Sequence, residues 1–204
     1  MYALIMAGGE GTRLDLGEKP LISICGRPMI AYVTDAFTSA GCRVIVAASP
    51  KTPMTRNWCR ALEIPCYNTE GAGFIEDMIG IVKEMDEKDP LFISVSDIPC
   101  VTPAIIQSVF RSYLAGNRDA LSVWVPSVLV KSCRGGMPYR ERIDGVEACP
   151  AGINILRGDR IDQTQDEISL LLDDPRLALN VNTRADRVAA EEFMKIQAGR
   201  KSDL

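Results

Sequence analysis

The sequence predicts an α/β fold in which a mostly parallel central sheet carries helices on both faces. Two observations predict it. Short apolar runs of strand length alternate with segments of helical periodicity along the whole chain, which is the pattern of βαβ units. The chain has 204 residues, enough to bury one continuous core and within the usual size of a single domain. We therefore expect one domain over residues 1–204.

Each apolar run is interpreted as a strand, and the helices fall around these strands. Strands are expected at 2–6, 43–48, 65–67, 91–96, 120–125, 151–156 and 177–180. Helices are expected at 28–40, 54–62, 74–87, 103–114, 165–172 and 184–197. The first helix is the best defined, because a proline in its first turn and Gly41 after its end are start and stop signals.

Two segments depart from this alternation. The stretch 127–148 has no clear period and contains Arg-Gly-Gly-Met-Pro, and we interpret it as an insertion on the scaffold or a substrate lid. The polar ending, 199–204, is expected to be frayed.

The composition is that of an ordinary globular protein, with 47% hydrophobic and 25% charged residues. A net charge of -4 offers no general attraction for DNA or RNA, so no nucleic-acid partner is expected. The apolar run at the N-terminus is too short for a secretory signal or a membrane span. These observations indicate a cytoplasmic protein with no membrane span.

The inventory of reactive side chains excludes several kinds of chemistry. The seven cysteines contain no Cys-x-x-Cys pair, so neither a zinc site nor a disulfide framework is predicted, and we expect reduced, mostly buried thiols. The chain has no histidine, which excludes Ser-His-Asp and Cys-His catalysis and histidine-ligated metals. Any bound metal ion must therefore be held mainly by oxygen atoms.

A glycine-rich loop follows the first predicted strand and runs to Lys19-Pro20 before any helix begins. Its glycines let the backbone approach a ligand closely and turn successive N–H groups toward an anion. Arg13 and Lys19 add positive charge. The loop therefore predicts a triphosphate site formed by Ala7, Gly8, Gly9, Gly11, Thr12, Arg13 and Lys19.

Two better-known glycine motifs do not fit this loop. A Walker loop requires Gly-Lys-Ser/Thr at its end, but here the lysine is followed by proline. The dinucleotide fingerprint requires a third glycine where this chain has Leu14, and no acidic residue ends the second strand. Both the P-loop and the oxidoreductase interpretations are therefore disfavoured.

Asp97 directly follows the apolar run 91–96, which places a carboxylate at the carboxyl edge of the predicted sheet. Ligands of open α/β sheets bind at this edge, and a carboxylate there suits Mg²⁺ bridging triphosphate oxygens. The alternative is that Asp97 only caps the next helix or forms a turn before Pro99, and residue type alone does not decide between the two.

Further polar residues follow the later strands. Asn180 and Asn182 come after the last predicted strand, where alternation would point both the same way, toward a metal shared with Asp97 or toward an acceptor phosphate. The alternative is that both only cap a helix or form a turn before Thr183, which is expected to be a helix cap. Gly152 and Asn154, at the start of a buried strand, fit a place where backbone approaches a nucleotide.

A base pocket is expected near the segment 68–77, where oxygen atoms could accept hydrogen bonds from guanine N1–H and its 2-amino group. The carboxylates there have an equally strong alternative, which is to complement the dipole of the following helix. The loop 49–53 is a second candidate wall. The residues assigned to this pocket are Ser49, Gly73, Glu76 and Asp77.

The run from Met6 to Leu21 resembles the signature of the nucleotidyltransferase superfamily that includes sugar-nucleotide pyrophosphorylases and the molybdenum cofactor guanylyltransferase. Within it, the whole chain is similar to the archaeal adenosylcobinamide-phosphate guanylyltransferases, through motifs that fall in their order. These are Ala3–Gly9, Glu18–Ile22, Ser49–Pro53, Gly73–Asp77, Pro150–Asn154 and Asn180–Thr183. No motif of this family matches 127–148.

The resemblance implies a Rossmann-like, GT-A-like nucleotidyltransferase fold and a GTP-dependent enzyme. Gly8, Gly9, Arg13 and Lys19 would hold the phosphates of GTP, Asp97 and Asn182 would bind Mg²⁺, and Gly152 would line the nucleotide pocket. Lys19, Arg13 and Asp97 would be the catalytic residues. Asn180 and Asn182 would contact the acceptor.

The expected reaction joins adenosylcobinamide phosphate to the α-phosphorus of GTP, giving adenosylcobinamide-GDP and pyrophosphate in cobalamin assembly or salvage. Because the acceptor is already an anionic phosphate, no general base is needed. Molybdopterin, phospholactate or a sugar phosphate are alternative acceptors. A GTP-binding module without catalysis is a different class, and it would leave Asp97 and Asn182 without a task. The sequence leaves the oligomeric state open, including a homodimer.

Overall fold

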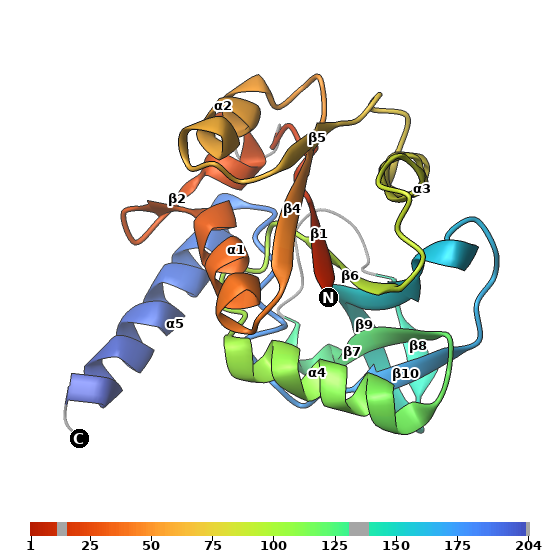
Figure 1. Cartoon of the computed structure of the whole chain (residues 1–204). Coiled ribbons are helices and arrows are strands. Elements are labelled where there is room, and N and C mark those ends of the chain that lie inside the picture. The colour runs from red at the N-terminus through yellow and green to blue at the C-terminus, as the bar shows by residue number, and fades with distance from the viewer. Residues whose placement is uncertain (12–15, 131–138, 203–204) are drawn as a thin grey trace.

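A computed structural model of the chain describes residues 1–11, 16–130 and 139–202, without the side chains of 200–202. Its main sheet has the order β10-β7-β9-β6-β1-β4-β5, with β8 paired to β9 (Figure 1). Only β9 runs antiparallel to its neighbours on this path. The mostly parallel α/β fold is thus confirmed. The strands are β1 Tyr2–Met6, β4 Arg43–Ala48, β5 Cys66–Asn68, β6 Pro90–Val95, β7 Ala120–Pro126, β8 Glu141–Ile143, β9 Val146–Arg157 and β10 Glu167–Leu171.

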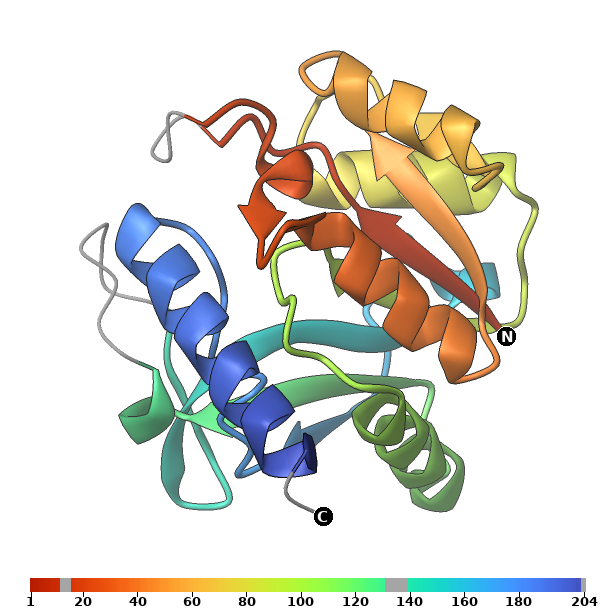
Figure 2. The same ribbon diagram turned by 90° about the vertical axis from the view of Figure 1, so that its left-hand side faces the viewer.

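Helices cover both faces of the sheet, as the alternation of buried residues on β1 requires. Ala3 and Ile5 pack in the core cluster that includes residues of α1 (Met29–Ser39), α2 (Pro53–Ala61) and α4 (Pro103–Gly116). Leu4 and Met6 point the other way and pack with α3 (Phe74–Glu84). Figure 2 shows α1 and α3 on opposite sides of β1 and β4.

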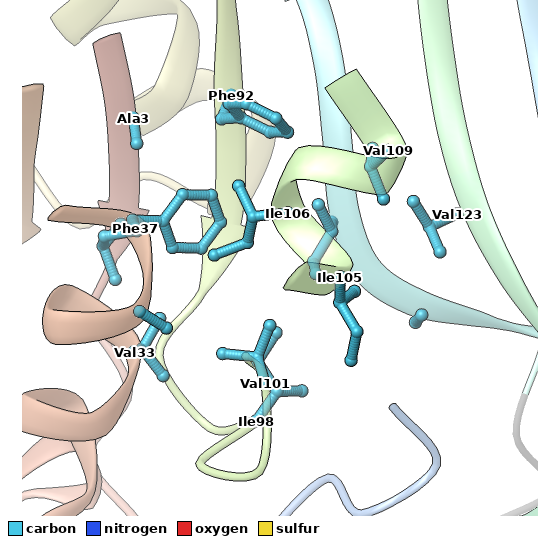
Figure 3. Close-up of a cluster of buried hydrophobic side chains, with 14 of the residues drawn as sticks. Ala3, Val33, Phe37, Phe92, Ile98, Val101, Ile105, Ile106, Val109 and Val123 are labelled. Carbon is cyan, nitrogen blue, oxygen red and sulfur yellow. The ribbon is translucent and has the colours of Figure 1, made fainter. Parts of the chain in front are cut away.

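The largest core cluster lies where α1 and α4 meet the sheet. Phe37 of α1 and Phe92 of β6 pack edge to face, with ring centroids 5.4 Å apart. Ile105, Ile106 and Val109 bring one face of α4 onto the same strands (Figure 3). This packing fixes the carboxyl ends of β1 and β6 relative to each other.

The last helix, α5 (Arg184–Ser202), packs outside the sheet on a smaller cluster. Val181 and Ala190 are fully buried there against Ile24 and Met29. Ile24 belongs to a two-stranded ribbon, β2 (Ser23–Ile24) and β3 (Arg27–Pro28). Short 3₁₀ turns complete the fold at η1 Lys19–Leu21, η2 Ser127–Leu129 and η3 Gly158–Arg160.

Two predicted elements were wrong. The helix expected at 165–172 is the strand β10, which pairs in parallel with β7. Its sequence alternates polar and apolar residues, and Ile168 and Leu170 face the main core, so a period of two prevails over helix propensity. The strand expected at 177–180 is a turn followed by irregular chain, in which Leu177 and Val181 are buried without any strand pairing.

The remaining differences concern where elements end. The strand expected at 151–156 extends over Val146–Arg157, because a second strand, β8, pairs with its first residues. The described part of 127–148 thus includes η2, β8 and the start of β9, while 131–138 lie outside the described residues. Helix α5 continues to Ser202, and the fraying expected for 199–204 stays a prediction.

None of the helices in the described ranges is both long and apolar enough to cross a membrane.

Candidate active site

The loops that carry the candidate residues leave the carboxyl ends of neighbouring strands. The glycine-rich loop follows β1, Ser49 follows β4, and Asp97 follows β6. Because β4, β1 and β6 are adjacent and parallel, these loops lie at one edge of the sheet. In Figure 2 the loop after β1 and the beginning of α5 lie on the same side of the molecule.

Lys19 is the centre of the site. Its amine donates hydrogen bonds to the carboxylate of Asp97 and, over 2.7 Å, to Oδ1 of Asn182. The Lys19 and Asp97 side chains are only 16% and 13% exposed. The structure therefore brings together the lysine, the carboxylate and the amide that the sequence assigned to one site.

Two hydrogen bonds hold Asp97 and Asn182, the partners of the Lys19 amine, in place. The amide of Val181 donates to the carbonyl of Asp97 over 2.9 Å, which ties the segment before α5 to the end of β6. Asn182 Nδ2 donates to Asn180 Oδ1 over 2.7 Å. The two asparagines thus lie together, although by this contact and not by the strand alternation that predicted it.

Thr183 and Asp186 fix the start of α5 next to the site. The Thr183 hydroxyl accepts from the amide of Asp186 at 3.2 Å, and the Asp186 carboxylate accepts from the amides of Asn182 and Thr183 at 3.1 and 2.8 Å. This reciprocal arrangement is a capping box. It confirms the predicted helix cap and fixes the backbone of Asn182.

The second oxygen of Asp97 suits a cation. Oδ1 is buried and has no hydrogen-bond partner among the residues that the structure describes. A buried carboxylate oxygen without a partner is costly, and a hard divalent cation is a partner that would satisfy it. No group of three His, Cys, Asp or Glu side chains gathers in the described part of the chain, so phosphate oxygens and water would have to complete the coordination.

The glycine-rich loop folds back on Lys19. The amide of Lys19 donates to the carbonyl of Gly9 at 3.3 Å. Gly11 has φ +71°, and a Cβ atom there would lie 3.0 Å from both the Gly17 carbonyl and Lys19 Cβ. Glycine is therefore required at Gly11 by conformation and by space. Thr12 and Arg13, which were assigned to the phosphates, lie outside the described residues.

Ser49 joins the loop after β4 to the glycine-rich loop. Its hydroxyl donates to the Gly8 carbonyl at 2.9 Å and accepts from the Lys51 amide at 3.2 Å. The side chain is nearly fully buried. Ala7 is buried too, and its amide donates to the Ala47 carbonyl at 2.8 Å, so its methyl group belongs to the core. Through its two hydrogen bonds, the Ser49 hydroxyl thus holds the glycine-rich loop in position.

Glu18 is a site residue that sequence reasoning left without a role. Its carboxylate accepts from the amides of Met54 and Thr55 and from the Thr55 hydroxyl, each at 2.7 Å. These donors form the first turn of α2, whose dipole favours a negative charge there. Glu18 therefore fixes the backbone next to Lys19. The signal was its place in the Glu-Lys-Pro motif.

Gly152 and Asn154 lie on β9, which crosses beside β6. Gly152 has φ +77°, and a Cβ atom there would lie 2.5 Å from Val95 Cγ2. Val95 stands two residues before Asp97, so Gly152 lets β9 pass close to the end of β6. Asn154 pairs with Ile93 and Ser122, further from the carboxyl edge. The nucleotide role of both remains a prediction.

The segment 68–77 begins at the end of β5, the strand that pairs with β4, and so lies at the same carboxyl edge of the sheet. Oδ1 of Asp77 accepts from the amides of Gly71 and Ala72, both at 3.1 Å, so this carboxylate organises the loop. Gly73 is the N-cap of α3, and both Glu76 and Asp77 stand in the first helical turn. Each acidic residue therefore has the helix-entry function that was the alternative, and contact of either residue with a base stays a prediction.

Cys100 is the cysteine nearest in sequence to Asp97. Burial raises the pKa of its thiol to about 12, so the thiol stays protonated and neutral near pH 7. The thiolate, the form that acts as a nucleophile or as a metal ligand, is therefore disfavoured at Cys100 near pH 7. The described cysteines are free, as expected for reduced thiols.

Comparison with known proteins defines the class. The synthetase for CMP:2-keto-3-deoxy-manno-octonic acid, solved in complex with CTP, superposes with a TM-score of 0.72 at 15% identity, over 96% of this chain and 98% of that one. That likeness shows the fold. Together with the relatives given below, fold and site define a nucleotidyltransferase.

Sequence comparison gives the family. A model described as a MobA-like NTP transferase domain matches residues 3–139, and the chain belongs to this family. Adenosylcobinamide-phosphate guanylyltransferase of Methanocaldococcus jannaschii is 31% identical over 201 residues, 96% of this chain and 98% of that protein. The catalytic subunit beta of mannose-1-phosphate guanylyltransferase from Danio rerio is 30% identical over 116 residues, 50% of this chain and 32% of that protein.

Proposed function

We propose that this enzyme transfers GMP from GTP to adenosylcobinamide phosphate, giving adenosylcobinamide-GDP and pyrophosphate. The full-length similarity to the Methanocaldococcus guanylyltransferase supports this acceptor over the others. The observation that carries the chemistry is the cluster of Lys19, Asp97 and Asn182 beside the glycine-rich loop. It combines a cation for phosphate oxygens with oxygen ligands for a metal ion.

During the reaction the Lys19 amine has two possible anionic partners, the Asp97 carboxylate and the triphosphate. In the structure its amine pairs with the carboxylate of Asp97. A triphosphate bound on the loop from Gly8 to Lys19 offers the amine a stronger anionic partner, and the flexible lysine stem can turn toward it. Arg13, on the same loop, would contact the phosphates as well.

When the Lys19 amine turns to the triphosphate, the carboxylate of Asp97 and the side-chain carbonyl of Asn182 would lose the cation that they bind in the structure. Both oxygen ligands suit Mg²⁺, which would neutralise charge on the triphosphate and on the departing pyrophosphate. The protein's own part is to hold these ligands, through the Val181 amide and the capping box of α5.

The transfer itself is a displacement at the α-phosphorus. An oxygen of the acceptor phosphate forms the new P–O bond, and the bond between the α-phosphorus and the bridging oxygen of pyrophosphate breaks. The leaving group takes the electron pair as pyrophosphate, and no proton has to move. Placement on the loop and charge neutralisation by Lys19, Arg13 and a Mg²⁺ ion that Asp97 would hold are then sufficient, with Asn180 and Asn182 facing the acceptor.

Pyrophosphate release tests this proposal. The purified chain is incubated with Mg²⁺, one of GTP, ATP, CTP or UTP, and adenosylcobinamide phosphate, molybdopterin, phospholactate or a sugar phosphate. We expect release with GTP and adenosylcobinamide phosphate and at least tenfold less with the other pairs. Faster release with another acceptor would replace the proposed substrate, and tight GTP binding without release from any acceptor would favour a non-catalytic module.

A further inference from the structure

Two cysteines at the turn between α2 and β5 have no part in the proposed reaction. Cys59 is buried near the end of α2, and Cys66 is the first residue of β5. The chain turns back between them, because the amide of Ile64 donates to the Cys59 carbonyl at 2.9 Å. The turn therefore returns Cys66 to the neighbourhood of Cys59.

Both thiols lie on the face of the sheet that α2 covers. Cys59 is fully buried in the main core cluster, and Cys66 packs against the same cluster. The next residue, Tyr67, packs with the cluster on the opposite face, so alternation along β5 directs the Cys66 thiol toward α2. There the Cys59 thiol donates a hydrogen bond to the sulfur of Cys66.

A positive charge stands over the same face of β5. Arg56 precedes Cys59 by one helical turn, and its guanidinium donates to Asn68 Oδ1 at 3.1 Å. Asn68 stands two residues after Cys66 on β5, so the two side chains leave the strand on the same side. The guanidinium therefore lies close enough to Cys66 to favour a negative charge on its sulfur.

The two thiols differ in exposure and in acidity. Cys66 is partly exposed, whereas Cys59 has no contact with solvent. The hydrogen bond from Cys59 lowers the pKa of Cys66, partial burial opposes this effect, and the Arg56 charge lowers the pKa further. The same hydrogen bond, together with burial, raises the pKa of Cys59. Cys66 is thus the thiol that ionises and that an oxidant can reach, with a second thiol beside it.

We propose that Cys66 is a site of oxidative modification, at which a peroxide is reduced and Cys59 then forms a disulfide bond with Cys66. The Cys66 thiolate attacks one oxygen of hydrogen peroxide, the O–O bond breaks, and the leaving hydroxide takes up the proton that the thiol gave up. The product is a sulfenic acid. The Cys59 sulfur attacks the Cys66 sulfur, the S–O bond breaks, and the hydroxide leaves with the Cys59 proton as water. The sulfur atoms lose the electrons that the peroxide gains, and neither GTP nor an acceptor takes part.

Peptide mapping of the full chain after treatment with hydrogen peroxide tests this oxidation. The remaining thiols are alkylated, and the chain is digested with trypsin without reductant. Trypsin cleaves after Arg56, Arg60 and Lys83, so the disulfide would join the peptides 57–60 and 61–83, each of which holds one cysteine. We expect these joined peptides to be the main oxidised product and to separate when dithiothreitol is added.

Variants separate the roles of the two thiols. In Cys59→Ser, peroxide should leave a sulfenic acid on Cys66 that dimedone traps, whereas in Cys66→Ser the buried Cys59 should stay reduced. Arg56→Gln should slow the oxidation of Cys66 about threefold. Arg60→Gln, at an exposed arginine of the same helix, should leave the rate unchanged. In the wild type, Cys66 should react about fivefold faster than the more exposed Cys25.

The proposal is overturned if the joined peptides are absent from the oxidised wild type, or if Cys66 and Cys25 react at equal rates. Oxidation of Cys59 in Cys66→Ser at the rate of the wild type would overturn it as well. The mapping and the comparison with Cys25 use the wild-type chain, so they decide even where thermal unfolding shows that a variant fails to fold. Because the oxidation needs no nucleotide, its failure leaves the proposed transfer of GMP untouched.

Discussion

The amine of Lys19 lies against the carboxylate of Asp97, 78 residues further along the chain, and both side chains are largely buried. Removing such a pair from water costs about as much free energy as the attraction returns, so the contact is poorly explained as a stabilising device. It agrees better with the proposed function, in which the Lys19 amine would bind a phosphate and the Asp97 carboxylate would bind a metal ion.

Lys19→Ala should slow turnover about 10²- to 10³-fold, because it removes a donor aimed at the charge that develops on the phosphates. Pyrophosphate release at saturating GTP and acceptor is the measurement, with circular dichroism to show that the fold is kept. Lys88→Ala is the matched control, since Lys88 is 67% exposed and pairs with Asp86. Wild-type turnover in the Lys19 variant would reject the role given to this lysine.

Asp97→Asn should raise the Mg²⁺ concentration needed for half-maximal activity by about tenfold or more, because a neutral amide oxygen binds a hard cation more weakly than a carboxylate. Turnover is measured over a Mg²⁺ titration at fixed GTP. Asp162→Asn, at a largely exposed carboxylate that pairs with Lys83, provides the control. An unchanged Mg²⁺ dependence with reduced turnover would mean that Asp97 only positions Lys19.

Glu18→Gln should destabilise the fold by about 1 kcal/mol, because the carboxylate accepts three hydrogen bonds at the positive end of α2. It should also raise the KM for GTP, since Glu18 holds the backbone next to Lys19. Urea unfolding and initial rates measure the two effects. Loss of stability with an unchanged KM would show that Glu18 serves α2 alone.

Much of the site could be predicted because its parts follow strands whose identity was clear. The runs 2–6 and 43–48 are strands with the predicted limits, and the loops after them hold Gly8 and Ser49. Asp97 follows a buried strand in the same way. Parallel pairing then brings these residues to one edge, so the order of elements alone placed them together.

Other features depend on contacts between distant segments, which local patterns do not encode. The run containing Ile168 and Leu170 becomes a strand because β7 offers it an open edge. Asn182 reaches Lys19 because the Val181 amide bonds to the Asp97 carbonyl, although no strand forms there. The role of Glu18 depends on the start of α2, 36 residues later.

Gly152→Ala should destabilise the protein by about 2–4 kcal/mol, because it combines a strained positive φ with a clash on Val95. Gly145→Ala separates the two effects, since Gly145 has φ +81° but nothing within 4 Å of an added Cβ. We expect about 1 kcal/mol for the control. Equal losses in chemical denaturation would show that β9 and β6 have room to move apart.

Arg176→Gln should lower the free energy of unfolding by at most about 1 kcal/mol at pH 7, and by less as the solution becomes acidic. The Arg176 guanidinium donates to both oxygens of Asp174, at 2.9 and 2.5 Å, and holds the pKa of that carboxyl below its ordinary value of 3.8. A depressed pKa in the folded state contributes stability above the unfolded value and loses it as pH falls through the folded one. The difference between wild type and variant should therefore be constant from pH 7 to about 5 and shrink progressively as the pH falls below 3.8 and through the lowered pKa. Urea unfolding at several pH values measures it, with Arg118→Gln at an exposed pair with Asp166 as the control. A difference that does not shrink with falling pH would mean that Arg176 stabilises the turn through packing and not through its charge.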